Sequence, residues 1–222
     1  GDITVTDTSL KGSALNLQNA IVRAGKNVEL ALGRGRDSSI NLTGAAVTAE
    51  TGNISIHGSL VSQVGNVTLQ ALQGDVLLDS SGTIAWSDST IQAQELVLDS
   101  SGRHTFSGTS SIDVNALTFQ GSSSLSTLTL SGTGTYKLGV ISNTGNREKV
   151  LYITGAQASG TSITDTRLEM SANSVLNLSG EAQLNAGYAK LTDSTLNAAN
   201  ITAQDNNRTI FDHATVQATA GD

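Results

Sequence analysis

The side chains most often used in catalysis and metal binding are few in this sequence and stand far apart. The three histidines, His57, His104 and His213, fit no metal-ligand spacing such as His-Glu-x-x-His, and the chain has no cysteine. There is no Gly-x-Ser-x-Gly elbow and no complete phosphate-binding loop. Stacked strands could still bring distant carboxylates together, but no acidic cluster stands out along the chain. We therefore predict that the protein is not an enzyme and holds no metal or cofactor.

Basic and aromatic residues gather in one stretch, where the alternation of polar and apolar residues weakens between positions 136 and 160. We expect an irregular loop there, either a solvated loop tip, which we favour, or a contact patch, because loops on a rigid scaffold often carry binding. A second irregular loop is expected at 31–39, whose Arg-Gly-Arg-Asp differs from the Arg-Gly-Asp tripeptide read by integrins. The candidate binding residues in these two stretches are Tyr136, Lys137, Arg147, Lys149, Tyr152, Arg34 and Arg36.

A unit of about twenty residues repeats in the middle of the chain. The segment VLLDSSG at 76–82 recurs as LVLDSSG at 96–102, and Trp86 and Phe106 are also separated by 20 positions. In stacked repeats these two rings would lie one above the other, and we favour an aromatic ladder over an exposed sugar-stacking platform. The pairs Leu78/Leu98 and Asp79/Asp99 follow the same ladder. For the two carboxylates we favour hydrogen bonds to turn amides over a metal site.

The repeat predicts the fold. One signature is Gly-Asp/Asn followed by an alternating strand, as in GDITV at 1–5, GNISI at 52–56 and GNVTL at 65–69; a second is an apolar residue, a polar residue and Ala. Short period-2 runs separated by turn residues at a fixed spacing are typical of a solenoid of strands. We predict an all-β, right-handed parallel β-helix of about ten coils, roughly 21 residues per coil, with residues 1–222 forming a single β-helical segment of a longer fibre.

Six Asn-x-Ser/Thr triplets occur, and they have two explanations. They could be glycosylation acceptors, or they could arise because an Asn corner followed by an alternating strand writes the same pattern; we favour the second. The triplets begin at Asn41, Asn53, Asn66, Asn177, Asn200 and Asn207.

The formal net charge of −7, from 12 basic and 19 acidic residues, disfavours nucleic acid and anionic membrane surfaces as partners. No apolar run is long enough for a membrane span, so we expect no membrane insertion.

The Gly-Asp/Asn-Ile/Val-Thr/Ser-Val/Leu runs and the Val/Leu/Ile-x-Ala strands between them resemble the repeats of filamentous-haemagglutinin-type exoproteins of bacterial two-partner secretion. The resemblance covers most of the chain and is weakest from about 122 to 160. It implies a right-handed β-helical fibre of a Gram-negative bacterium, exported through an outer-membrane transporter and then secreted or displayed at the bacterial cell surface. The chain has no proline and therefore lacks the family's amino-terminal Asn-Pro-Asn-Leu motif, so the resemblance implies an internal piece of the fibre.

On this basis we expect an extracellular adhesin segment, a virulence factor in cell adhesion that attaches non-covalently to a host cell-surface or glycan receptor. The alternative is the shaft or receptor-binding segment of a contact-dependent growth inhibition protein, whose partner is a receptor on a neighbouring bacterium. A polysaccharide-cleaving β-helix enzyme is the third and least favoured hypothesis.

Overall fold

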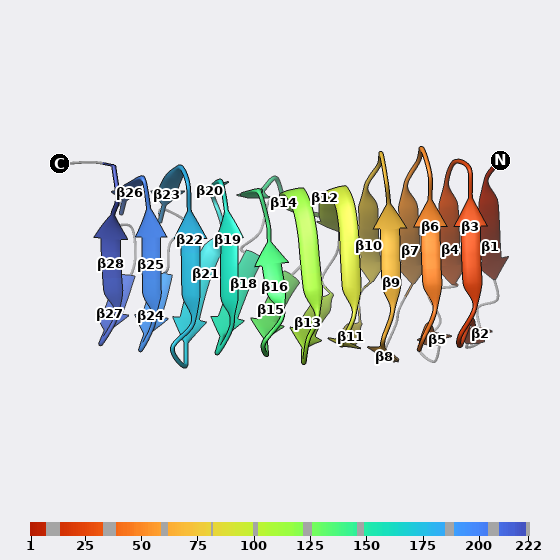
Figure 1. Cartoon of the computed structure of the whole chain (residues 1–222), viewed down its shortest axis with the longest axis horizontal. Coiled ribbons are helices and arrows are strands. Elements are labelled where there is room, and N and C mark those ends of the chain that lie inside the picture. Colours follow the sequence, from red (N-terminus) through yellow and green to blue (C-terminus); the bar gives the residue numbers. More distant parts are fainter. Residues whose placement is uncertain are drawn as a thin grey trace.

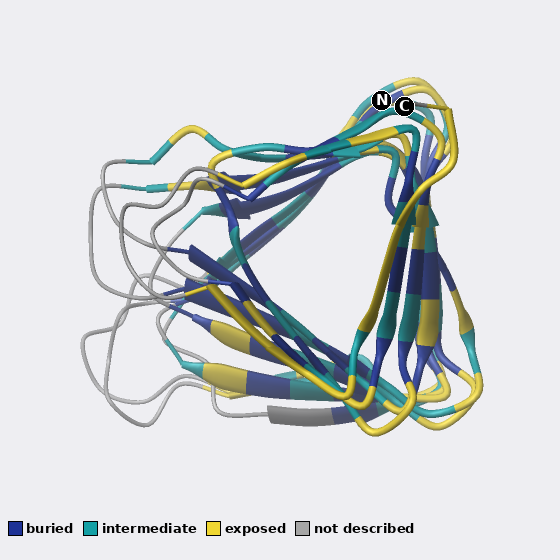
Figure 2. Cartoon of the chain, turned by 90° about the vertical axis from the view of Figure 1, so that its left-hand side faces the viewer, coloured by how far each residue is buried: buried dark blue, intermediate teal, exposed yellow. Residues whose placement is uncertain are grey.

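The computed structural model describes residues 1–7, 14–32, 39–58, 62–80, 82–99, 102–121, 126–145, 149–184, 189–203 and 209–220. These residues form strands and turns with no helix, and the strands pair in parallel. They wind into a right-handed solenoid whose two termini lie at opposite ends of the long axis (Figure 1). Seen from one end, the coils form a triangular tube (Figure 2). The predicted fold class is confirmed.

Three faces of strands make up the tube. The first face contains β1 (Ile3–Asp7), β4 (Val28–Leu32), β7 (Ile54–Gly58), β10 (Val76–Ser80), the later halves of β12 (Thr90–Asp99) and β14 (Ser111–Gln120), β17 (Val140–Asn143), β20 (Ser162–Ile163), β23 (Glu181–Gln183) and β26 (Asn200–Thr202). The third face contains β3 (Ile21–Ala24), β6 (Ala46–Ala49), β9 (Thr68–Ala71), the earlier halves of β12 and β14, β16 (Thr135–Lys137), β19 (Gln157–Gly160), β22 (Val175–Leu178), β25 (Thr195–Ala198) and β28 (Thr215–Ala218). Because β12 and β14 run across the corner between them, these two faces join into one 18-stranded sheet.

The second face is divided into two sheets. A two-stranded sheet contains β2 (Ala14–Asn16) and β5 (Ser39–Asn41). An eight-stranded sheet contains β8 (Ser62–Gly65), β11 (Thr83–Ser87), β13 (Arg103–Ser107), β15 (Ser126–Ser131), β18 (Lys149–Thr154), β21 (Arg167–Ser171), β24 (Ala189–Thr192) and β27 (Thr209–Asp212). This second sheet makes about eight continuous turns, so the coil count differs slightly from the ten that the repeat suggested.

The coils are uneven in length. Along the first face the step from Ile3 to Val28 is 25 residues and the next, to Ile54, is 26, whereas the step from Ile163 to Ala182 is only 19. The average is about 22 residues, one more than predicted. Register between neighbouring strands is kept throughout, so the differences in length are taken up at the corners.

Two stretches were expected to be irregular. At 31–39, β4 ends at Leu32 and β5 begins at Ser39, and residues 33–38 lie outside the described part. At 136–160 the prediction is wrong for the described residues, because β16, β17, β18 and β19 continue the three faces there. The alternation looks weak in the sequence because β16 has only three residues and a turn with Gly139 at φ 57° follows at once.

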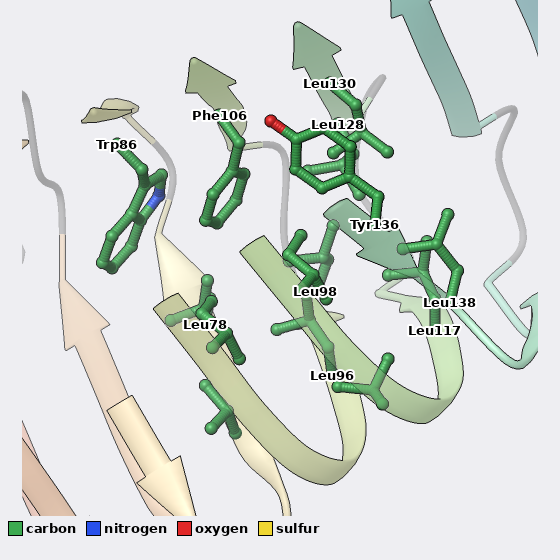
Figure 3. Close-up of a cluster of buried hydrophobic side chains, with 14 of the residues drawn as sticks. Leu78, Trp86, Leu96, Leu98, Phe106, Leu117, Leu128, Leu130, Tyr136 and Leu138 are labelled. Atoms are coloured by element: carbon green, nitrogen blue, oxygen red, sulfur yellow. The ribbon is translucent and has the colours of Figure 1, made fainter. Parts of the chain in front are cut away.

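The core is a set of inward-facing columns along the axis. Trp86 and Phe106 pair in register, their ring centroids lie 5.4 Å apart and their planes differ by 1°. Both side chains are fully buried, as are the paired Leu78 and Leu98 (Figure 3). The predicted ladder is therefore a core ladder, and neither ring forms a surface platform.

The Gly-Asp/Asn signature forms a ladder at the corner before the first face. The backbone N–H and Nδ2 of Asn27 donate to Asp2 Oδ1 over 3.0 and 2.9 Å. Asn27 Oδ1 in turn accepts the N–H of Asn53 (2.9 Å), and Asn53 Oδ1 accepts the N–H of Asp75 (2.9 Å). Each side chain thus accepts a hydrogen bond from the backbone of the next coil, which is why the motif recurs with the coil.

The glycines that precede this ladder are required by close packing. A Cβ at Gly52 would lie 2.3 Å from Asn27 Oδ1, and one at Gly74 would lie 2.3 Å from the carbonyl oxygen of Gly52. Neither glycine has a positive φ. Most of the positive-φ positions among the described residues lie instead at the corner between the second and third faces, where Asn66 (φ 55°) and Gly108 (φ 68°) turn the chain.

Replacing Asn53 tests the ladder. Asn53→Ala removes the acceptor of the Asp75 N–H, so the free energy of unfolding should fall by about 1 kcal/mol. Asn53→Asp keeps an acceptor at the same place, as Asp2 does two coils earlier, and should recover most of the loss. Urea unfolding of the three proteins measures both effects; equal losses in the two variants would contradict the ladder.

Phe106→Ala tests the aromatic stack. Truncating this fully buried ring should lower the free energy of unfolding by about 3–5 kcal/mol, because the cavity cannot be filled by neighbours held in register. The same change at Phe211, which is 47% exposed on β27, is the matched control and should cost far less. Similar urea midpoints for the two variants would refute the assignment of Phe106 to the core.

Candidate functional site

The residues predicted as a contact patch do not share one surface. Lys137 is exposed on the third face, where Nζ lies 3.2 Å from Asp113 Oδ2. Tyr152 is half-buried on the outer side of the second face. Arg34, Arg36 and Arg147 lie outside the described residues. The structure thus separates Lys137 from Tyr152 by a corner of the tube.

Tyr136 is wrongly predicted as a surface residue. Its ring points into the core near Leu128 and Leu130 (Figure 3) and is fully buried. The hydroxyl donates to the carbonyl oxygen of Ser131 over 2.7 Å. Burial raises the pKa of Tyr136 to about 12, although the hydrogen bond to Ser131 opposes this shift. The middle position of β16 faces inward, so the aromatic ring fills space between two faces.

Lys149 is also wrongly predicted as a surface residue. It begins β18 at an inward position, in register with Ser126, and is fully buried. Burial lowers the pKa of the Lys149 ammonium, while the charge of Asp99 acts in the opposite direction. Lys149 therefore belongs to the interior of the corner that leads into the second face.

The two carboxylates of the repeat have different partners. Asp79 Oδ2 lies 3.3 Å from His57 Nδ1 on the neighbouring strand, so its described partner is a histidine ring instead of the turn amide that we favoured. Asp99 lies close enough to Lys149 for their charges to interact. No group of three or more potential metal-ligating side chains occurs among the described residues.

A cluster on the outer side of the second face joins Tyr152, which the sequence analysis named, to Glu169 and Lys190, which it missed. Tyr152 pairs with Glu169, and Glu169 pairs with Lys190, so three successive coils place these side chains in one column. Neighbouring strands are about 4.8 Å apart, so the column spans roughly 10 Å along the axis. The sequence separations are 17 and 21 residues, and a constant 21-residue repeat would have aligned Tyr152 with Asn173 instead.

This column lines a depression of about 500 Å³ that is open to solvent. A second column beside it supplies hydroxyl groups from Thr154, Ser171 and Thr192. Ser171 Oγ donates to Thr154 Oγ1 over 3.1 Å, whereas Thr192 Oγ1 is buried without a hydrogen-bond partner. The volume falls within the roughly 300–1,000 Å³ of small-molecule sites, and the depression combines an aromatic ring with several polar groups, as such sites do.

The charges in the depression are unequal. Glu169 is paired with Arg167 on its own strand, and both side chains are mostly buried. Lys190 is exposed and makes no ion pair within the ranges that the structure covers. The depression therefore presents one uncompensated cation next to a neutralised Arg–Glu pair.

His104 is a buried titratable group of the core whose pKa is strongly lowered. It is inward-facing between Ile84 and Leu128, fully buried, and its Nδ1 has no hydrogen-bond partner. Desolvation lowers the pKa of His104 from 6.5 to about 4. The neutral imidazole thus occupies a core position that aliphatic side chains hold on the two neighbouring coils. It is not among the described residues that line the depression.

No protein-family model, curated protein or solved structure matches this chain in the comparisons. Within the described residues, no helix is long and apolar enough to cross a membrane. The functional argument therefore rests on the geometry of the second face.

His104 makes a testable contribution to stability against pH. The unfolded chain binds the His104 proton more tightly than the folded one, so stability is lost as pH falls from about 6.5 towards 4. The full loss is about 3 kcal/mol, since one pKa unit corresponds to about 1.4 kcal/mol. His104→Leu should remove this part of the pH dependence.

The measurement is the free energy of unfolding of wild type and variant at several values between pH 4 and 7. An unchanged slope in His104→Leu would show that folding does not lower the pKa of His104.

Proposed function

We propose that the chain is an extracellular adhesin segment, part of a secreted β-helical fibre that attaches non-covalently to cell-surface or glycan receptors. The observation that carries the proposal is the open depression on the second face, with Tyr152, Glu169 and Lys190 in one column. Export through an outer-membrane transporter and display at the bacterial cell surface belong to the same proposal.

The solenoid supports contact without conformational change. Tyr152, Glu169 and Lys190 lie on β18, β21 and β24, each hydrogen-bonded to a strand on both sides. Their backbones are therefore held before a ligand arrives, and less ordering entropy is lost on binding. A rigid rod that displays a preformed depression suits attachment along its side.

Binding is better supported than cleavage of a polysaccharide. Glycosidases use two carboxyl groups placed about 5–9.5 Å apart. Glu169 is the one carboxylate among the described residues that line the depression, and Arg167 neutralises it. The site offers a ring, a cation and hydroxyls, which are groups that recognise a ligand.

Tyr152→Ala tests the proposed function. Loss of the ring should weaken attachment of the labelled protein to receptor-bearing cells about fivefold, since an aromatic contact contributes about 1 kcal/mol. Tyr152→Phe keeps the ring and should retain most of the binding, while Lys137→Ala on the third face should bind as wild type. Cell-binding isotherms and melting temperatures are recorded for all four proteins.

The choice of cells separates the two contact hypotheses. An adhesin should bind epithelial cells or their isolated glycans, whereas a growth-inhibition shaft should bind neighbouring Gram-negative bacteria. A wild-type protein that attaches to neither would refute the proposed function. Equal binding by Tyr152→Ala and wild type would remove the depression from it.

A further inference from the structure

The depression has a charge and shape that indicate the chemistry of its ligand. Its column runs parallel to the rod axis over three coils, so a linear ligand would lie along the rod. Tyr152 offers an aromatic surface at one end of the column, and Lys190 offers an ammonium group at the other. Between them, Glu169 is occupied by Arg167, so its carboxylate does not repel an approaching anion as an unpaired one would.

The hydroxyl column favours a saccharide over a peptide. Thr154, Ser171 and Thr192 stand side by side with the aromatic and basic column. Hydroxyl groups both donate and accept hydrogen bonds, which suits a ligand that is itself rich in hydroxyls. Sugar rings supply both an apolar face for Tyr152 and several hydroxyls.

The net charge limits how acidic this saccharide can be. Lys190 is the one cation among the described residues lining the depression and can pair with one anionic group, while the chain as a whole carries a net charge of −7. A polysulfated chain would be repelled by the protein beyond the depression. A sugar acid with one carboxylate per ring has a lower charge density and meets this constraint.

We propose that the depression binds a carboxylated saccharide, with a sugar ring against Tyr152 and a carboxylate at the Lys190 ammonium. This assignment rests on the proposed function, because it names the ligand class of the same site. The hydroxyl column places the remaining ring hydroxyls beside Thr154 and Ser171.

The test compares two probes with the same sugar backbone, one with charged carboxylates and one in which these are neutral methyl esters. Isothermal titration of the 222-residue protein uses a galacturonic acid hexasaccharide and the same hexasaccharide with its carboxylates methyl-esterified. The free acid should bind about fivefold tighter than the ester, and 0.5 M salt should reduce the difference. Lys190→Gln should abolish this preference, whereas Lys137→Gln, which removes a lysine from the third face, should keep it. Tyr152→Ala should weaken binding of both probes.

Several outcomes would overturn the assignment: no binding of the acid, equal binding of acid and ester, or equal effects of Lys190→Gln and Lys137→Gln. Lys190-dependent binding of a hexaglutamate peptide as tight as that of the acid would likewise replace the saccharide by an acidic peptide. A cell-binding measurement distinguishes failure of the ligand assignment from failure of the proposed function. If wild type and Lys190→Gln attach equally well to cells, the ligand assignment fails and the adhesin proposal stands.

Discussion

In-register parallel pairing of successive coils is the interaction on which the rest of this structure depends. A slip of one residue would turn every inward side chain of a strand outward, so the apolar columns and the backbone ladder must agree at each coil. Once they agree, each position becomes a column along the rod. The buried Trp86–Phe106 pair, the corner ladder of Asn27 and Asn53 and the surface column of Tyr152 and Glu169 all follow from this one constraint.

Where coil length is nearly constant, these columns can be read from the sequence. Between 76 and 106 the step is 20 residues, and the predicted stacks of Trp86 on Phe106 and Leu78 on Leu98 are both found. The Gly-Asp/Asn signature also marks a corner of each coil, but the sequence does not show why its glycine is needed. Gly52 is needed because the Asn27 side chain of the preceding coil occupies the space that a Cβ at position 52 would fill. Only the structure shows that these two residues are neighbours.

Prediction from sequence fails where corners change length or where a residue type contradicts its usual environment. Tyr136 and Lys149 looked like surface residues because lysines are seldom buried and the alternation around them is short, yet both occupy inward positions. Two of the three residues in the surface column, Glu169 and Lys190, were missed for a related reason. Tyr152 and Glu169 are separated by a short coil, and Glu169 and Lys190 by a longer one. The sequence alone does not show which coil is shortened, so it does not show that these side chains align.

The solenoid also separates the demands of stability from those of binding. Each coil contacts only its neighbours, so stability is close to a sum of local terms along the rod. The buried His104 lies on β13, whereas Glu169 lies on β21, with β15 and β18 between them. A change in protonation at His104 therefore acts on the coils around it and leaves the register at Glu169 intact until the neighbouring coils unfold. The outer surface of the second face can vary in the same way, because the outward side chains do not take part in the core columns that hold the coils together.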